Sequence, residues 1–426
     1  MTHIMDRRID RRRFLLQTAA AAGAVAAAGC TLEVEDDADP SEDPVMPQFY
    51  EIQDKPDAVY LPTHREAMEM LEPVEAGEYT LAPMLSYVHP FWIISGDEIE
   101  REEPDDGNGV HLMIVVWDTE TGVVLPVDSG AQLRVEKDGE QVGSPRTPWT
   151  MISQQMGFHF GDNVPLADDG TYTAELTIPP LDVRTTGDLE GKFAETETAS
   201  FEFEYDAEFR NEIPARVEYL EREEWGEPGA LEPMSHGSGG DDGGSTDSGD
   251  DDGEHEPDGN ESGHEHSGDG QTDADEDGGH VPFSALPPAE EYPGTGLEPH
   301  DGEGEATSGD AAFVARLVES GSRFVEGDER YLLVSPRTPY NRVPLADMSM
   351  TAAVSGVESA DSVALEQTID GEYGIHYGAA LAGVEPGDTV TIEIDSFPQV
   401  ARHQGYDTAF FDMPPVELTV PESVEQ

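Results

Sequence analysis

The sequence predicts an all-β protein built from two β-sandwich domains. Two observations carry this prediction: short runs of alternating apolar residues fill most of the chain between Gly- and Asp-containing turns, and a pattern in the first half recurs in the second. Between the halves lies a tract composed almost wholly of Gly, Ser, Asp, Glu and His, which cannot bury a core. That tract is expected to join the two domains as a flexible linker.

Changes in composition divide the chain into five expected segments. They are a signal peptide (1–30), an acidic tether (31–45), a first sandwich (46–225), a disordered acidic linker (226–307) and a second sandwich (308–423). The linker contains the sequon Asn260-Glu261-Ser262, a candidate for glycosylation.

The strand prediction rests on short apolar runs separated by turn signals such as Thr121-Gly122 and Asp138-Gly139. In the first half these runs are 111–117, 131–136, 171–178 and 199–205, and in the second half 331–334, 348–354, 389–394 and 416–420. Many short strands at this spacing indicate immunoglobulin-like sandwiches. Helix is expected to be scarce, with 311–319 as a short candidate.

An internal repeat supports the two-domain interpretation. The segment from Gly157 to Gly161, Gly-Phe-His-Phe-Gly, recurs from Gly374 to Gly378 as Gly-Ile-His-Tyr-Gly, and residues 124–135 align with 343–354. Each repeat places a histidine between glycines, in what we expect to be a tight turn where a ligand or another backbone can approach. The halves are therefore predicted to be two copies of one sandwich.

The N-terminus has the order of an export signal. Arg11 and Arg12 precede one further residue and then Phe14-Leu15, which fits the twin-arginine pattern, and an Ala-rich run follows. Small residues then precede Cys30, the one cysteine of the chain. We therefore expect export by the twin-arginine route and a lipid anchor on Cys30 at the outer face of the cytoplasmic membrane. The alternative is an ordinary cleaved signal with an incidental cysteine.

The charge balance is strongly acidic. The chain has 22 Lys and Arg against 92 Asp and Glu, a formal net charge of -70. Such self-repulsion opposes a compact fold in dilute salt, but at 1 M salt the Debye length falls to about 3 Å and screens it. The composition indicates adaptation to high salt. It disfavours nucleic-acid binding, because no basic stripe exists to contact phosphates.

The sequence shows no standard catalytic signature, so an enzyme is not expected. The remaining candidates for chemistry are imidazoles and thioethers, a ligand set that suits Cu(I) and tolerates Cu(II) or Fe(II). Most of them lie in the first half: His64, Met68, Met70, Met84, His89, His111, Met113, Met151, Met156 and His159. The plainer alternative is that strand methionines fill the core and that His111 is structural.

Residues 151–164 carry a family resemblance. Their Gly157, His159, Gly161 and Asn163 are similar to a fingerprint, Gly-Pro-His-Tyr-Gly-x-Asn after a Met-bearing strand, with a later Arg-His. This fingerprint is found in periplasmic copper-binding iron-transport proteins, which are immunoglobulin-like accessory proteins of high-affinity Fe(II) uptake. Segment 151–164 therefore resembles this family. The resemblance implies bound copper or iron and an iron or copper permease as partner, here in a haloarchaeal lipoprotein version.

The two halves depart from this fingerprint in complementary ways. Phe158 replaces the proline, and the first half lacks the later histidine around 184–187. The second half supplies that residue as Arg402-His403, but it has lost the methionine before His376.

Members of the family resembled form dimers with metal near the interface, which implies an intramolecular pseudo-dimer here. We infer that His89, Met151 or Met156, and His159 of the first copy meet His403 of the second, with His376 as the counterpart of His159. The alternative is a surface immunoglobulin-like lipoprotein with a structural or protein-binding role and no metal.

Overall fold

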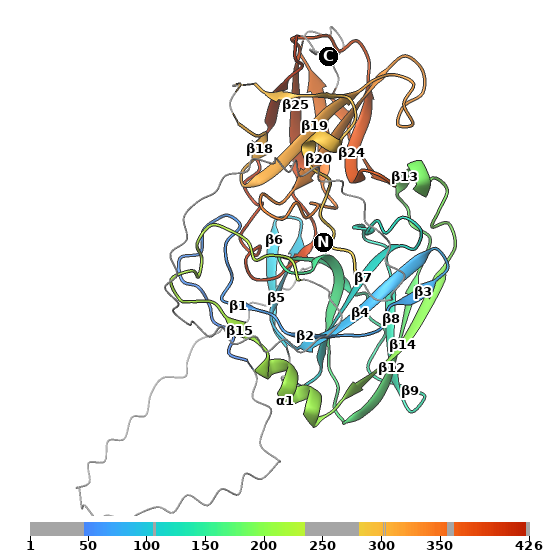
Figure 1. Ribbon diagram of the computed structural model, residues 1–426, viewed down its shortest axis with the longest axis vertical. Coiled ribbons are helices and arrows are strands. Elements are labelled where there is room, and N and C mark those ends of the chain that lie inside the picture. The colour runs from blue at the N-terminus through green and yellow to red at the C-terminus, as the bar shows by residue number, and fades with distance from the viewer. Residues whose placement is uncertain are drawn as a thin grey trace, which may run out of the picture. The chain divides into compact units, whose positions relative to one another are not determined.

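The computed structural model describes residues 47–422 apart from 105–107, 235–280, 301, 303 and 356–361. In this part of the chain strands dominate, with one α-helix, α1 (Ala207–Ala215), and two 3-10 turns, η1 (Gly187–Leu189) and η2 (Ala289–Glu291) (Figure 1). The predicted all-β class with two β-rich domains is therefore confirmed. No helix of the described residues is long and apolar enough to cross a membrane. The predicted leader, Cys30, the tether, Asn260 and the linker histidines lie outside the described residues.

The N-terminal sandwich has two sheets. The first belongs to a nine-stranded sheet and contains, in order, β4 (Tyr79–Tyr87), β7 (Val110–Asp118), β11 (Gly157–Val164) and β10 (Trp149–Ser153). The second runs β14 (Glu197–Tyr205), β12 (Gly170–Ile178), β8 (Gln132–Lys137) and β9 (Glu140–Gln141). Burial alternates along β12 and β14, so one face of the second sheet meets solvent. By contrast, β4, β7 and β11 are buried on both faces.

The C-terminal sandwich repeats this plan. Its first sheet contains, in order, β19 (Ala311–Val318), β20 (Arg330–Arg337), β24 (Gly374–Leu381) and β23 (Glu366–Asp370). Its second sheet contains β27 (Val416–Thr419), β25 (Thr389–Ser396), β21 (Ser349–Val354) and β22 (Val363–Ala364). The seven main strands are β4, β7, β8, β10, β11, β12 and β14 in the first sandwich, and β19, β20, β21, β23, β24, β25 and β27 in the second. Numbered along the chain, strands one, two, five and four form one sheet in that order, and strands three, six and seven form the other. That is the strand order of a constant-type immunoglobulin domain, as predicted.

Shorter strands extend these sheets. β2 (Met68–Met70) and β3 (Val74–Ala76) pair with β4, whereas β1 (His64–Arg65) and β15 (Glu218–Tyr219) form a separate two-stranded sheet. β5 (Phe91–Ser95) pairs with β6 (Glu98–Glu102), while β16 (Thr295–Gly296) and β18 (Thr307–Ser308) pair with β19, and β17 (Glu298–Pro299) pairs with β27.

The two sandwiches exchange one short strand each. β26 (Ala401–Arg402), which follows β25, runs parallel to β10 with Ala401 opposite Met151. β13 (Arg184–Thr186), which follows β12, runs parallel to β23 with Arg184 opposite Thr368. Each exchanged strand thus lies between the sixth and seventh strands of its own sandwich and extends the fourth strand of the other. The exchange is reciprocal, so the sandwiches interlock.

Three expectations about elements need correction. Residues 311–319 were expected to form a helix, but Ala311–Val318 form β19, which pairs with β20, β16 and β18. The run is apolar on both faces, so its sequence shows no alternation of apolar and polar residues. The helix α1 was missed, although Asp206 caps it by accepting a hydrogen bond from the Phe209 backbone N–H. Finally, β16 and β17 lie inside the expected linker 226–307, so that part of it is folded.

Candidate metal centre

Two of the candidate histidines lie on the face of the nine-stranded sheet that turns away from the sandwich core. Along β7, Leu112 and Ile114 enter the main hydrophobic core, and since side chains alternate along a strand, His111 points to the other face. Along β11, Phe160 enters the same core, so His159 shares the face of His111. The alternation that builds the core therefore also presents these imidazoles.

His159 lies in a strand and not in the expected tight turn. Gly157 has a φ of 71° and begins β11 directly after the turn, and Gly374 has a φ of 64° and begins β24 in the same way. The glycines supply the left-handed conformation that leads into each strand. His159 is then held directly opposite Met151 of β10.

His403 comes from the C-terminal sandwich on the exchanged strand. It follows β26, and its backbone N–H donates to the carbonyl of Ile152 at 3.1 Å. The preceding Arg402 is fully buried, donates to the carbonyls of Pro398 and Tyr406, and lies 4.3 Å from the ring centroid of Phe411. These contacts hold the loop that carries His403 against the edge of β10.

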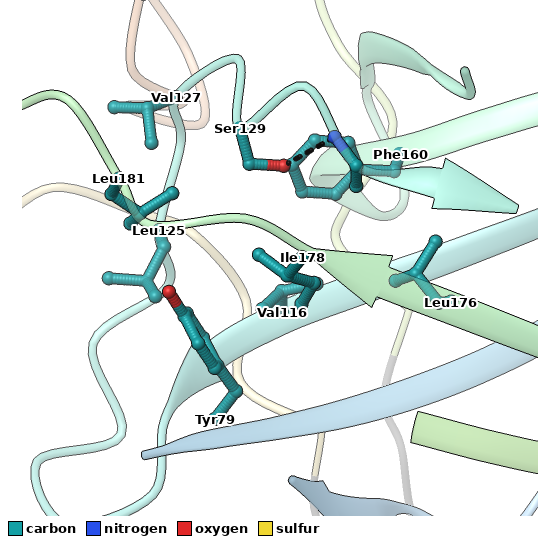
Figure 2. A pocket seen from close by; sticks show the side chains of 10 residues that line it. Tyr79, Val116, Leu125, Val127, Ser129, Phe160, Leu176, Ile178 and Leu181 are labelled. Carbon is teal, nitrogen blue, oxygen red and sulfur yellow. Dashed lines mark hydrogen bonds between the residues drawn. The ribbon is translucent and has the colours of Figure 1, made fainter. Parts of the chain in front are cut away.

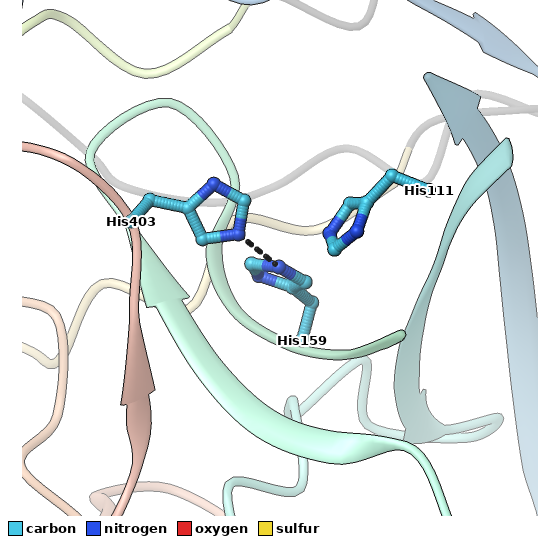
Figure 3. A group of neighbouring side chains, drawn as sticks. All are labelled: His111, His159 and His403. Carbon is cyan, nitrogen blue, oxygen red and sulfur yellow. Dashed lines mark hydrogen bonds between the residues drawn. The ribbon is translucent and has the colours of Figure 1, made fainter. Parts of the chain in front are cut away.

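Four imidazoles meet in one buried cluster, which we call the imidazole cluster: His89, His111, His159 and His403. The Nε2 atoms of His159 and His403 are 3.3 Å apart (Figure 3). The ring of His89 lies 4.3 Å from that of His111 and 5.1 Å from that of His403. None of the four is more than 3% exposed. Candidate ligand atoms of His111, His159 and His403 all lie within 4.8 Å of one another.

The hydrogen bonds of this cluster determine its tautomers. In each ring Nδ1 faces an oxygen that accepts: Pro90 O for His89 (3.1 Å), Asn163 Oδ1 for His111 (3.1 Å), Gly157 O for His159 (3.2 Å) and Glu66 Oε1 for His403 (2.9 Å). The Asn163 amide is oriented because its Nδ2 donates to the His89 carbonyl at 2.9 Å. Each Nδ1 therefore carries the hydrogen, and each Nε2 offers a lone pair.

These lone pairs lack a donor. The Nε2 atoms of His89 and His111 have no hydrogen-bond partner, and those of His159 and His403 lie 3.3 Å apart, where a bound ion could contact both. Burial lowers the pKa of His89 to about 4 and that of His159 to about 3, so these two rings are neutral at neutral pH. Buried acceptors without a donor, as at Nε2 of His89 and His111, are costly unless a cation sits among them. The residues present fit a metal ion, held by Nε2 atoms whose Nδ1 partners orient the rings.

Glu66 forms the partly exposed edge of the cluster. Its side chain is 16% exposed, and its Oε1 accepts from His403 and lies 3.9 Å from Nε2 of His89. Burial by itself raises the pKa of this carboxyl, but the neighbouring His403 and His89 outweigh burial and hold the pKa well below its ordinary value. Glu66, His89 and His403 form a second group whose candidate ligand atoms lie within 4.8 Å.

Met151 brings a sulfur to the same place. A Cβ built on Gly161 would stand 2.5 Å from the Met151 sulfur and 3.3 Å from Nε2 of His111. The missing side chain of Gly161 therefore leaves the room that both groups occupy. The predicted role of this glycine, close approach of a ligand group, matches the contact.

The structure does not bring every predicted ligand to the cluster. Met156 packs in an apolar cluster with Met84 and Met113, the plainer role that the sequence allowed. His376 lies in the C-terminal sheet, where its Nε2 faces the hydroxyl of Tyr331 at 3.3 Å.

Two cluster residues were missed by sequence reasoning. His111 was interpreted as structural, although it alternates with core residues of β7 and therefore points to the other face. Glu66 was passed over, although it lies two residues after His64, one of the candidate histidines.

One small cavity adjoins the site, and another lies in the core of the N-terminal sandwich. One, of about 20 Å³, adjoins the imidazole cluster and is lined by polar residues that include Glu66, His64, Gln154 and His403. The other, of about 10 Å³, lies between the sheets of the N-terminal sandwich and is lined mainly by apolar side chains such as Val116 (Figure 2). The second is a packing void of the core, with room for one water at most.

Comparisons with known proteins match parts of the chain. Residues 290–419 match a family described as a domain of unknown function, DUF7350. No curated protein matches the chain. Similar solved structures include a copper-bound variant of FetP from a uropathogenic Escherichia coli strain, with 20% identity and a TM-score of 0.23 over 32% of this chain and 97% of that chain. They also include FetP of that strain as isolated after expression in the periplasm, with 19% identity and a TM-score of 0.22 over 32% and 95%.

Proposed function

We propose that this chain is a metal-binding protein that holds one transition-metal ion, copper in first place, in the imidazole cluster. The observation that carries the proposal is the convergence of four buried Nε2 atoms, two of which, those of His89 and His111, have no hydrogen-bond partner. A metal ion would satisfy all of them at once, whereas a single proton could satisfy one pair. The hydrogen-bonded Nδ1 atoms orient the rings before the ion arrives, which lowers the cost of binding.

The ligand types favour copper over other divalent ions. Imidazole nitrogens suit copper, zinc and iron, while the thioether of Met151 adds a soft ligand that favours copper. Copper(II) also stands highest in the affinity order of the divalent first-row metals. Glu66 adds a carboxylate oxygen at the exposed edge, which is a ligand that Fe(II) accepts. Iron is therefore the second candidate.

We further propose that the protein acts outside the cytoplasm, anchored through Cys30, and assists iron or copper uptake by holding the ion for a permease. The predicted leader and the sequence resemblance support this part. A protein that binds and releases an ion needs no nucleophile or general base, so no catalytic activity is proposed.

Metal titration of the full chain at molar salt tests the proposal. The chain is titrated with Cu(II), Cu(I) and Fe(II), and the variants His159→Ala and His376→Ala are compared. These two histidines take the same position in the two sandwiches, and both are fully buried. We expect one tightly bound Cu(II), lost in His159→Ala and kept in His376→Ala. Absence of stoichiometric binding, or equal losses in both variants, would contradict the proposal and favour a surface module without metal.

A further inference from the structure

Four methionines gather beside the imidazole cluster on the same sheet. Met84, Met113 and Met156 belong to one apolar cluster, and Met68 packs against it. We call these four residues the thioether cluster. On the other face of the same strands, β4 and β7 use Leu, Ile and Val instead of Met to fill the main core.

Strand register places two of these thioethers in a row that ends at the imidazoles. Met70 of β2 is directly opposite Met84 of β4, and Met84 is directly opposite Met113 of β7. Met113 in turn is opposite Gly161 of β11. Directly opposite residues have Cβ atoms roughly 5 Å apart and share a face. The row runs from Met70, which is 37% exposed, to the glycine over which Met151 and His111 meet.

The C-terminal sandwich provides an internal comparison. There Leu333 takes the position of Met113, Arg316 that of Met84 and Tyr373 that of Met156. The corresponding cluster of buried residues contains Val, Leu, Phe and Tyr and no methionine. The fold therefore does not need thioethers on this face. They are present in the copy that has the imidazole cluster and missing from the copy that lacks it.

We propose that the thioether cluster is a separate binding site for Cu(I). Thioethers are uncharged soft ligands, so they select Cu(I) and discriminate against Cu(II), Zn(II) and Fe(II). The surrounding residues Ala82, Val115 and Trp117 exclude water and offer no competing hard ligand. Cu(I) binding by the thioether cluster does not depend on the proposed function. A role of this cluster in supplying copper to the imidazole cluster would rest on that function.

Silver(I) serves as a redox-inert probe for this site in the full chain at molar salt. The His159→Ala background disables the imidazole cluster. In that background the double variant Met84→Leu/Met113→Leu removes two thioethers at nearly constant volume. The matched control is Met348→Leu/Met350→Leu, two buried methionines in the core of the C-terminal sandwich.

We expect one Ag(I) to bind in the His159→Ala background and in the control, and the affinity to fall roughly 10- to 100-fold in Met84→Leu/Met113→Leu. Copper-edge absorption of the Cu(I) form should show sulfur neighbours that this double variant loses. Equal Ag(I) affinity in all three proteins would overturn the proposal, and so would loss of Ag(I) binding through His159→Ala alone. Cu(II) binding by the chain with His159 intact tests the imidazole cluster separately, so either site can fail without the other.

Discussion

His111 and Tyr331 occupy the same position in the two sandwiches. The residue at this position is the neighbour of the buried histidine in each copy, His159 in the first and His376 in the second. A Cβ on Gly378 would stand 2.2 Å from the Tyr331 ring, and a Cβ on Gly161 would stand 3.3 Å from Nε2 of His111. In the C-terminal copy Nδ1 of His376 faces a carbonyl, and the Tyr331 hydroxyl reaches Nε2 at 3.3 Å. In the N-terminal copy His111 offers a second lone pair instead. In the C-terminal copy the tyrosine hydroxyl satisfies the histidine, whereas in the N-terminal copy the imidazoles can bind a cation.

Tyr331→Phe should expose this difference. Without the hydroxyl, Nε2 of His376 becomes a buried acceptor with no donor, which costs about 1–3 kcal/mol of unfolding free energy. Copper binding should stay unchanged, because the imidazole cluster is untouched. Chemical denaturation and copper titration of the variant check both parts. A variant as stable as the parent would show that the hydroxyl contributes nothing at this position.

Gly161→Ala should weaken metal binding more than folding. The new Cβ meets the flexible end of Met151 at 2.5 Å and His111 at 3.3 Å, so these ligands must move. Gly378→Ala is the matched control, because its Cβ meets the Tyr331 ring at 2.2 Å and the backbone oxygen of Leu332 at 2.6 Å. We expect a loss of copper affinity in the first variant and a loss of stability, about 1–3 kcal/mol or more, in the second. The reverse pattern would place Gly161 outside the site.

Glu66→Ala and Glu66→Gln separate two roles of this residue. Both remove the charge, but the glutamine oxygen can still accept from Nδ1 of His403. If Glu66 acts by orienting His403, Glu66→Ala should lose roughly 10- to 100-fold in copper affinity and Glu66→Gln much less. Isothermal titration of both variants at molar salt makes the comparison. Equal losses would indicate that the carboxylate itself binds the ion.

Asp347→Asn should stabilise the protein at neutral pH but not in acid. Burial, with the nearby charge of Asp128, raises the pKa of Asp347 to about 6, above the value of an unfolded chain. The stability that this carboxyl contributes is therefore full below about pH 4 and is lost as the pH rises through about 6. Asparagine tolerates the φ of 55° at this position. We expect the advantage of the variant to grow to about 1–3 kcal/mol between pH 4.5 and 8.

Denaturant unfolding at fixed molar salt across this pH range checks the Asp347 prediction. Asp128→Asn is the control, because it removes the neighbouring charge but leaves Asp347 buried, and it should give a smaller gain. A difference between Asp347→Asn and the parent that does not change with pH would contradict the assigned titration.

Much of the fold was predictable from local patterns. The apolar runs located four of the seven main strands of each sandwich, and the repeat of Gly157 to Gly161 at Gly374 to Gly378 predicted two copies of one sandwich. Because a period of two is a property of each strand by itself, it can be recognised without knowing which strands pair. The same reasoning failed for β19, because a strand covered on both faces shows no alternation.

The sequence by itself determined the class, the repeat, the acidic charge and the histidine and methionine ligand types, because these depend on composition and on short spacings. The family resemblance implied that His89 and His159 meet His403, and only the tertiary structure decided that His111 and Glu66 join them. His111 joins the cluster through the pairing of β7 with β11, and the Glu66 backbone N–H donates to the Gln155 side chain. His403 reaches His159 across 244 residues from the end of an exchanged strand. Hydrogen bonds to Nδ1 then direct the lone pairs inward. Such convergence depends on non-local strand register, and no local pattern in the chain encodes it.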